Sequence, residues 1–189
     1  TEYKGKPCQV ANYFDENGTL VGQKLRFQDK SFAVKGKLST TFFGQQLYNN
    51  GVRLIITEGE IDCLTVSQLL GNQEPVVSIP CGVQSAKKVF KANLKWLEGF
   101  NEVVVVFDND DAGRKGAKEI EGILSPEKLR IAVLKQYKDP NEYYINDKGN
   151  ELLEALENAK KVTPENIINA DTLLDDLLEE PEEVTGYSL

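Results

Sequence analysis

Short apolar runs alternate with amphipathic segments from residue 53 onward, and this alternation restricts the fold more than any other feature of the chain. The apolar runs cover residues 53–57, 75–80, 103–107 and 129–135. The segments between them, such as residues 86–100 and 111–124, have the apolar spacing of single helices. Strands that are apolar along their whole length are buried on both faces, which is typical of a parallel sheet covered by helices. The sequence therefore predicts an α/β domain with a parallel sheet flanked by helices.

The first part of the chain has a different pattern, because residues 7–34 read as β structure. Asn17 and Gly18 tolerate positive φ and predict a tight hairpin turn between two strands. In the second strand Lys24 and Arg26 share the face opposite Leu25, and Lys30 extends that face beyond the strand. Alternation alone requires some polar side, so an ordinary solvated face explains this pattern equally well. A small, mainly β subdomain is expected.

The chain ends in an acidic segment. Residues 150–162 predict a helix, residues 171–180 a short acidic amphipathic helix, and residues 179–186 a linker. We therefore expect three parts: a β subdomain over residues 1–50, the α/β domain over 51–162, and a helical acidic linker over 163–189.

Composition excludes several kinds of chemistry. The 189 residues contain no histidine, which excludes Ser-His-Asp and Cys-His catalysis and disfavours a catalytic zinc site. The three cysteines are widely spaced, which fits a reducing cytosol better than a disulfide framework. No apolar run approaches the roughly 18–20 residues of a membrane span, and no signal peptide is evident. The net charge of −8 disfavours nucleic acid, but residues 23–37 and 86–95 are locally basic.

Carboxylates follow two of the predicted strands. Glu58 comes directly after residues 53–57, and Asp108 and Asp110 follow the run at 103–107. Asp62 falls in the first turn of the next predicted helix. Ligand sites in open parallel sheets lie beyond the carboxyl ends of the strands, so these acids should converge on one pocket. Close carboxylates repel one another, and an all-oxygen site favours Mg²⁺, with Mn²⁺ as an alternative, and hence phosphoryl-transfer chemistry.

Each acid also has a simpler explanation. Asp111 is a candidate cap for the helix that begins there, and Asp62 is a candidate partner of a helix dipole. Glu60 is expected at the solvated surface. No G-x-x-x-x-G-K-[ST] motif occurs, so a P-loop is absent from this sequence.

The combination "TEGEID" at residues 57–62 and "VFDNDDAGR" at residues 106–114 resembles the TOPRIM domain. That family holds magnesium with a Glu after one strand and a D-x-D after another, and it occurs in primases, topoisomerases, small nucleases and recombination proteins. The resemblance implies that Glu58, Asp108 and Asp110 are catalytic metal ligands. Asp62 would be an additional acid of the same site.

Three further segments resemble the primases of this family, in particular the bifunctional primase–helicases of podovirus-type phages. "KDPNEYY" at residues 138–144 looks like their acidic segment, which implies that Asp139 lies near the metal pocket. "GQKLRFQDKSF" at residues 22–32 is similar to the basic strand before the TOPRIM domain, which implies contacts of Lys24, Arg26 and Lys30 with template or nucleotide. "CGVQSAKK" at residues 81–88 resembles the loop and helix after the second strand, where Lys87 and Lys88 would be available to phosphates.

The resemblance implies a DNA primase core that synthesises short RNA primers on single-stranded DNA from ribonucleoside triphosphates. We expect a piece of a longer primase–helicase, without its zinc-binding and helicase domains, acting in the cytoplasm of a phage-infected bacterium and forming hexamers only with the helicase. Two alternatives remain: a TOPRIM nuclease that uses the same metals, and a catalytically inactive module that binds single-stranded DNA in a replicative helicase. A type IA topoisomerase is disfavoured, because its Tyr-bearing domains do not fit in this length.

Overall fold

The structure is a computed structural model that describes residues 1–38 and 40–162. The predicted linker over residues 163–189, with its short helix at 171–180, lies outside the described residues. In the part of the chain that is described, no helix is long and apolar enough to cross a membrane.

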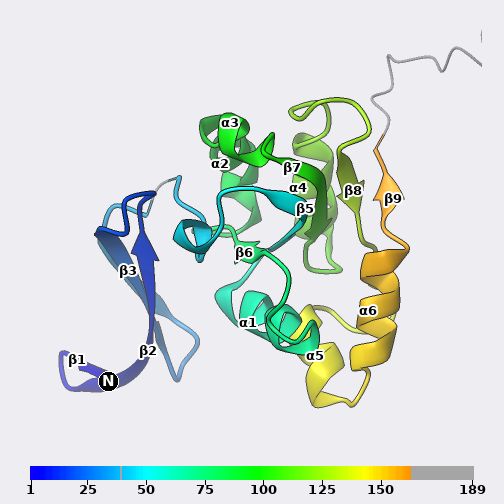
Figure 1. Cartoon of the computed structure of the whole chain (residues 1–189). Helices are drawn as coiled ribbons and strands as arrows, with labels where there is room; N and C mark the ends of the chain where they lie inside the picture. Colours follow the sequence, from blue (N-terminus) through cyan, green and yellow to red (C-terminus); the bar gives the residue numbers. More distant parts are fainter. Residues whose placement is uncertain (39, 163–189) are drawn as a thin grey trace, which may run out of the picture.

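The N-terminal part is an antiparallel sheet, drawn in blue in Figure 1. Among the described residues it has four strands in the order β1-β2-β3-β4: Glu2–Tyr3, Lys6–Phe14, Leu20–Phe27 and Phe32–Gly36. The predicted hairpin turn is confirmed between β2 and β3. Gly18 has φ 76°, and the Asp15 side chain accepts hydrogen bonds from the backbone N–H groups of Asn17 and Thr19, both at 2.9 Å. Mainly β structure at the N-terminus is therefore confirmed.

The larger part contains the predicted parallel strands. They are β5 (Gly51–Thr57), β6 (Val76–Ser78), β7 (Phe100–Val106) and β8 (Leu129–Ile131), and the order over the described residues is β6-β5-β7-β8-β9. β9 (Lys160–Lys161) pairs antiparallel to β8, so the sheet is mixed and the prediction of a parallel sheet was incomplete. The helix predicted over 150–162 ends at Glu157 for the same reason, because the chain beyond it joins the edge of β8.

Helices cover both faces of this sheet, as the apolar strands predict (Figure 1). The sheet residues alternate between two separate cores: Leu54 and Ile56 belong to one, and Ile55 to the other. The helices that contribute to the first core are η2 (a 3-10 helix, Val83–Ser85), α2 (Ala86–Ala92), α3 (Leu94–Leu97) and α4 (Asp111–Glu119). The helices that contribute to the second core are α1 (Glu60–Leu69), α5 (Pro140–Ile145) and α6 (Gly149–Glu157). A further 3-10 helix, η1 (Gln45–Leu47), precedes β5.

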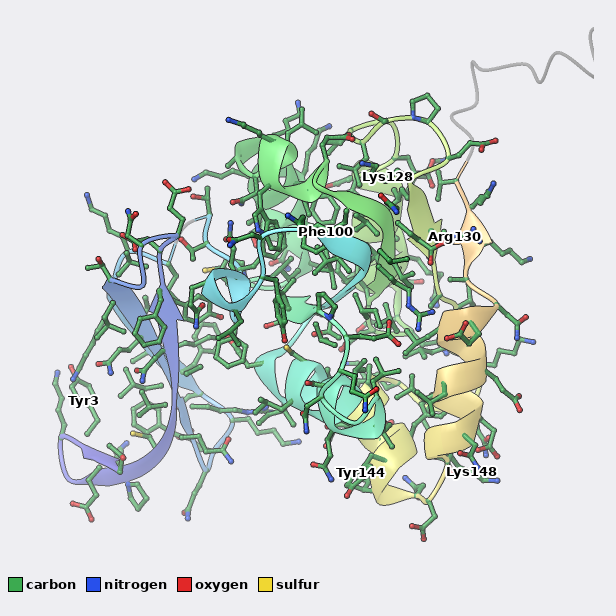
Figure 2. All side chains as sticks on the ribbon, viewed as in Figure 1. Tyr3, Phe100, Lys128, Arg130, Tyr144 and Lys148 are labelled. Atoms are coloured by element: carbon green, nitrogen blue, oxygen red, sulfur yellow. The ribbon has the colours of Figure 1, made fainter. Side chains whose placement is uncertain are left out.

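The single helix predicted over residues 86–100 is broken at Asn93 into α2 and α3. The Asn93 side-chain amide donates to the carbonyls of Val89 and Thr40, at 2.8 and 2.6 Å. This tie to the connecting segment before β5 ends α2, while Leu97 and Phe100 remain in the core. Figure 2 shows Phe100 in the interior, where its ring packs edge-on against Trp96 with centroids 5.1 Å apart.

The two sheets meet beside α1. Buried Tyr13 on β2 packs edge-on against Phe43, with ring centroids 5.7 Å apart, and Phe43 forms a backbone bridge to Ser78 on β6. The Tyr13 hydroxyl donates a hydrogen bond to Glu60 on α1, and Lys24 Nζ on β3 lies 3.0 Å from the Glu60 carboxylate. These contacts set one face of the β subdomain against the carboxyl ends of the parallel strands.

Candidate active site

Glu58 and Asp108 lie at the same edge of the sheet, as the strand pattern predicts. Glu58 directly follows β5, and Asp108 lies two residues after the end of β7. These strands are neighbours, and Thr57 and Val106, the last residue of each, are paired in register. The strand order therefore brings together two acids that are 50 positions apart in the sequence.

A cavity of about 710 Å³ lies between this edge and the N-terminal sheet. Its lining has an acidic wall from the α/β part and a basic wall from the β subdomain. The charged groups that line it are Glu58, Glu60, Asp62, Asp108, Asp139, Glu142, Lys24, Arg26, Lys30 and Lys138. The structure therefore gathers four of the five predicted metal-site acids, and the three basic residues of the N-terminal part, around one cavity.

Glu58 keeps an oxygen free for a further partner. Its Oε1 accepts a hydrogen bond from the backbone N–H of Val83 at 3.3 Å, whereas the buried Oε2 has no hydrogen-bond partner among the described residues. Burial, reinforced by the charge of Asp108, raises the pKa of Glu58. A buried carboxylate oxygen without a partner is costly, and a bound cation would offset that cost.

Asp108 and Asp110 share one ammonium group. Lys138 Nζ lies 3.3 Å from a carboxylate oxygen of each. Burial raises the pKa of Asp108, and the Lys138 ammonium opposes that effect. The pKa of Asp110 is lowered by the hydrogen bond from the backbone N–H of Gly113, and the paired Lys138 has its pKa raised. In this structure the ammonium of Lys138 thus balances part of the negative charge of Asp108 and Asp110.

The helix cap differs from the one that the sequence suggested. Asp110, not Asp111, caps α4, because its side chain accepts from Gly113 N–H at 2.9 Å. Asp111 is fully exposed, is not one of the residues that line the cavity, and pairs with Arg114 at 2.7 Å. Gly113 is required here, since a Cβ on it would lie 2.0 Å from the Asp108 carbonyl oxygen.

Asp62 and Asp139 form the far side of the acidic wall. Asp139 caps α5 by accepting from Glu142 N–H at 2.7 Å, and Asp62 accepts from Asn141 N–H at 3.1 Å. Burial and the nearby charge of Asp139 raise the pKa of Asp62 to about 7. Asp62 therefore holds its proton much more tightly than an exposed aspartate does.

The donor set fits a divalent cation. In the described part of the chain no three His, Cys, Asp or Glu side chains are already grouped closely enough to hold a metal ion. However, the buried Oε2 of Glu58 has no partner in this part of the chain, and Asp108 and Asp110 share a single ammonium, so these oxygen donors together still carry unbalanced negative charge. Such a set matches Mg²⁺, which prefers a few carboxylates and keeps several waters.

On the basic wall, Lys24 is already engaged. Its ammonium pairs with Glu60 on α1, so the expectation that Glu60 lies at the solvated surface was wrong. Arg26 and Lys30 line the same wall. Lys87 and Lys88 are exposed on α2 and are not part of the cavity lining.

Lys138 and Glu60 are the site residues that sequence reasoning missed. Lys138 directly precedes Asp139 in the quoted "KDPNEYY". Because Asp139 was expected near the other acids, the lysine next to it could have been predicted as their positively charged partner. Glu60 offered none, because its partners Tyr13 and Lys24 are distant in sequence and only tertiary packing brings them near.

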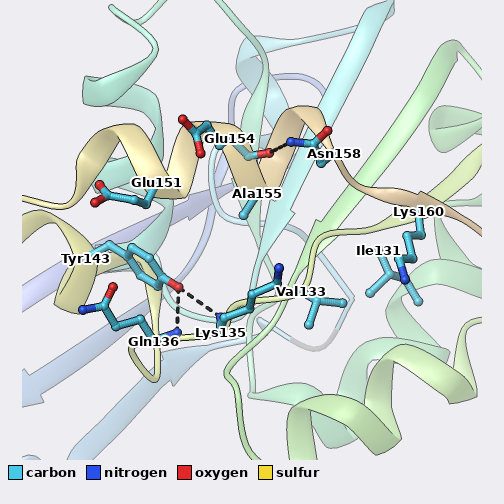
Figure 3. A pocket seen from close by; sticks show the side chains of 10 residues that line it. All are labelled: Ile131, Val133, Lys135, Gln136, Tyr143, Glu151, Glu154, Ala155, Asn158 and Lys160. Atoms are coloured by element: carbon cyan, nitrogen blue, oxygen red, sulfur yellow. Dashed lines mark hydrogen bonds between the residues drawn. The ribbon is translucent and has the colours of Figure 1, made fainter.

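Hydrogen bonds at a second cavity hold the segment that leads to Lys138 in place. This cavity, of about 380 Å³, lies between β8 and α6 (Figure 3). The hydroxyl of buried Tyr143 accepts hydrogen bonds from the backbone N–H groups of Lys135 and Gln136, at 3.0 and 3.1 Å. These bonds tie α5 to the chain just before Lys138, and so help to place Lys138 and Asp139 against the acidic pair.

Comparison with known proteins agrees with this architecture. The Toprim-like family matches residues 55–144, and the family described as bacteriophage T7 DNA helicase/primase, N-terminal a+b fold, matches residues 1–36. The fold and the acids at the strand ends thus define a Toprim-type domain, a class that is generally metal-dependent. An N-terminal unit of the phage helicase/primase type precedes it in the chain.

Three of the similar proteins come from bacteriophages. The DNA helicase/primase of Enterobacteria phage T3 is 40% identical over 168 residues, which are 88% of this chain and 30% of the relative. The primase fragment of the bacteriophage T7 primase-helicase is 41% identical with a TM-score of 0.78, over 82% of this chain and 65% of that one. A third match is a chain in the structure of the bacteriophage T7 lagging-strand DNA polymerase interacting with primase domains of two gp4 subunits, bound to an RNA/DNA hybrid and dTTP. It is 41% identical with a TM-score of 0.80, and the match covers 85% of this chain and 82% of that one.

The chain belongs to the Toprim primase domains of the phage T7/T3-type helicase/primases. It spans about a third of the length of the T3 relative.

Proposed function

We propose that this chain is the RNA-polymerase core of a phage primase–helicase, which synthesises short RNA primers on a single-stranded DNA template. The observation that carries the proposal is the cavity in which an acidic wall at the ends of β5 and β7 faces a basic wall on β3. Metal-dependent nucleotidyl transfer needs carboxylates for the metal and cations for phosphates at the same place. The T7 complex, whose primase domains are bound to an RNA/DNA hybrid and dTTP, supports the same reading.

In this proposal Glu58, Asp108 and Asp110 hold Mg²⁺, for which Mn²⁺ can substitute, and Asp62 and Asp139 are additional acids of the site. When bound, the ion supplies charge neutralisation on the triphosphate and activation of the primer 3′ hydroxyl. In the reaction the 3′ hydroxyl gives its proton to water, its oxygen bonds to the α-phosphorus of the ribonucleotide, the bond from that phosphorus to the bridging oxygen breaks, and pyrophosphate leaves.

The protein's own residues position the reactants. Arg26 and Lys30 hold template or nucleotide phosphates, and arginine can do so with two parallel hydrogen bonds. Lys24, anchored by Glu60, adds positive charge beside them. Lys138 balances Asp108 and Asp110 before the ion arrives, and its half-exposed side chain can then turn toward the triphosphate. Lys87 and Lys88, outside the cavity on α2, would contact phosphates only farther along the nucleic acid.

We further propose the division into a β subdomain at 1–50, the Toprim domain at 51–162 and a linker at 163–189 toward a helicase domain. The separate sheets of the first two parts support it. In the full-length protein the zinc-binding and helicase domains would complete the enzyme, and hexamers would form through the helicase. The phage relatives support activity in the cytoplasm of an infected bacterium.

Primer extension tests the proposal. An end-labelled short RNA annealed to a DNA template is given all four ribonucleotides with Mg²⁺ or Mn²⁺, and the product is resolved on a gel. We expect lengthened label with the unmodified chain, and at least a 100-fold loss of extension with Asp108→Asn, on the order of the loss of a key electrostatic contact. The matched control is Asp111→Asn, because Asp111 is an exposed acid three positions away that lies outside the cavity lining.

The other outcomes identify the alternatives. Shortened label that depends on Asp108 would indicate a nuclease. DNA binding without any change of the label, under both metals, would indicate a module that binds single-stranded DNA without catalysis. Equal loss of extension in both variants would remove the assignment of Asp108 to the metal.

A further inference from the structure

Phe32 is an exposed aromatic residue on the basic wall of the cavity. It is the first residue of β4, one of the two edge strands of the N-terminal sheet in the described part of the chain, and it pairs in register with Arg26 on β3. The residue is 65% exposed and also lines the cavity. Because so little of Phe32 is buried, packing in the N-terminal sheet does not explain a phenyl ring at this position.

One cation lies over this ring, and two others line the same wall. Lys24 Nζ lies 5.6 Å from its centroid, within the range of a cation–π contact, and is held in place by Glu60. Arg26 and Lys30 line the same wall. Cross-strand partners lie on the same face of a sheet, so Arg26 and Phe32 face the cavity side by side.

The two walls favour different parts of a nucleic acid. On the opposite wall the carboxylates of Glu58, Asp108 and Asp139 repel phosphates unless a metal ion is bound there. A sugar–phosphate backbone is therefore directed to the basic wall, where an exposed aromatic face beside the phosphate-binding cations offers stacking to a base. Positively charged grooves with interspersed aromatic rings are the common design of single-strand binding sites.

We propose that Phe32 is a stacking platform for a base of the single-stranded DNA template, whose phosphates Arg26 and Lys30 hold. The proposal deepens the proposed function and rests on it. The template is the ligand, rather than the incoming ribonucleotide, because the triphosphate belongs with the metal carboxylates on the other wall. Stacking also accepts all four bases, which a template path requires.

Val34 provides a matched control. It lies two residues after Phe32 on the same face of β4, pairs in register with Lys24, and is 45% exposed. As an aliphatic residue it offers no aromatic face. Phe32→Leu removes the ring but keeps an apolar residue of similar size, and Phe32→Tyr keeps the ring, so the set separates stacking from general hydrophobic contact.

The test measures DNA binding without metal or nucleotide. A fluorescent oligothymidylate of about 12 nucleotides, a length typical of single-strand sites, and an abasic strand of equal length are titrated in EDTA, with fluorescence anisotropy as the readout. We expect Phe32→Leu to bind the oligothymidylate roughly 10-fold more weakly. Phe32→Tyr and Val34→Ala should keep the original affinity, and the abasic strand should bind equally to the unmodified protein and to Phe32→Leu.

Equal affinity of Phe32→Leu and the unmodified protein for the oligothymidylate would overturn the proposal, as would an equal loss on the abasic strand. Primer extension with the same preparations separates this failure from that of the proposed function. If the unmodified chain extends primers and Phe32→Leu still binds normally, only the stacking role is refuted. If the unmodified chain extends no primer, the assignment to a template is refuted whatever the binding data.

Discussion

Single residues of the acidic wall carry the clearest consequences. The carboxylates at the ends of β5 and β7 are crowded, and the structure relieves the crowding in two ways. The Lys138 ammonium balances part of the charge of Asp108 and Asp110, and Asp62 has a raised pKa. A single substitution by a residue of similar shape can remove either the ammonium of Lys138 or the ionisable group of Asp62.

Lys138 should compete with a divalent cation for the acidic pair. Lys138→Gln removes the ammonium that lies 3.3 Å from both Asp108 and Asp110. Because the lysine is about half exposed, its attraction to the pair is modest, and we expect Mg²⁺ to bind roughly 3- to 10-fold more tightly to the variant. Isothermal titration calorimetry measures this. Lys135→Gln, which removes an exposed lysine from the same segment, should leave the affinity unchanged; unchanged affinity in Lys138→Gln as well would refute the competition.

Asp62 should make the metal-free protein less stable as the pH rises. Its pKa is about 7 in the folded protein against an ordinary value of 3.8. Between pH 4 and 7 the unfolded chain has lost this proton while the folded chain keeps it, so the free energy of unfolding falls by about 1.4 kcal/mol per pH unit from this group. Asp62→Asn cannot ionise and should melt several degrees higher at pH 8 in EDTA.

The decisive measurement is how the difference in melting temperature between Asp62→Asn and the unmodified protein changes with pH. At pH 4 the aspartate is protonated in the folded state, so the melting temperatures of Asp62→Asn and the unmodified protein should nearly coincide. A difference of the same size at pH 4 and pH 8 would contradict a raised pKa of Asp62.

At the scale of elements, the junction of β7 and α4 sets the position of the D-x-D pair. Asp110 caps the helix, and Gly113 lets the first turn of α4 approach the backbone of Asp108. The sequence predicted both the strand and the helix here. The sequence pattern suggested Asp111 as the cap, whereas Asp110 takes that role, because the two aspartates are adjacent and both residue types suit it.

Gly113→Ala should disturb this junction. The added Cβ would meet the Asp108 carbonyl oxygen at 2.0 Å, so the strand end or the helix must shift. We expect the free energy of unfolding to fall by about 2–4 kcal/mol, measured by urea denaturation, with a loss of primer extension because Asp108 moves. Lys115→Ala, at an exposed site of the same helix, should stay within about 0.5 kcal/mol of the unmodified protein. Unchanged stability of Gly113→Ala would mean that the close approach is not required.

At the scale of the whole molecule, Glu60 connects the two sheets. It accepts a hydrogen bond from buried Tyr13 and pairs with Lys24, so one residue of α1 holds two strands of the β subdomain. Burial and the adjacent Glu60 raise the pKa of Tyr13, which keeps its hydroxyl a donor. The two walls of the cavity depend on this connection.

Glu60→Ala should therefore loosen the subdomain. The Tyr13 hydroxyl would lose its partner in a buried position, at a cost of about 1–3 kcal/mol. We expect lower thermal stability and faster hydrogen–deuterium exchange in β2 and β3, with Glu119→Ala, which removes a partly exposed glutamate from α4, as the control. Adding Tyr13→Phe to Glu60→Ala should recover part of the stability, because the unpaired hydroxyl is then gone. If the double variant is no more stable than Glu60→Ala, the hydroxyl is not the cause.

The sequence by itself determined the α/β alternation, the N-terminal hairpin and the placement of Glu58 and Asp108 at strand ends. These follow from local periodicity and from the geometry of parallel sheets, which short-range patterns encode. Only the tertiary structure decided that Lys138 lies between Asp108 and Asp110, that Glu60 is tied to Tyr13 and Lys24, and that residues 160–161 form an antiparallel edge strand. Those contacts join residues 28 or more positions apart in the sequence. They form only because the packed fold brings these strand edges and side chains within a few ångströms of one another, and a local sequence pattern contains no information about such distances.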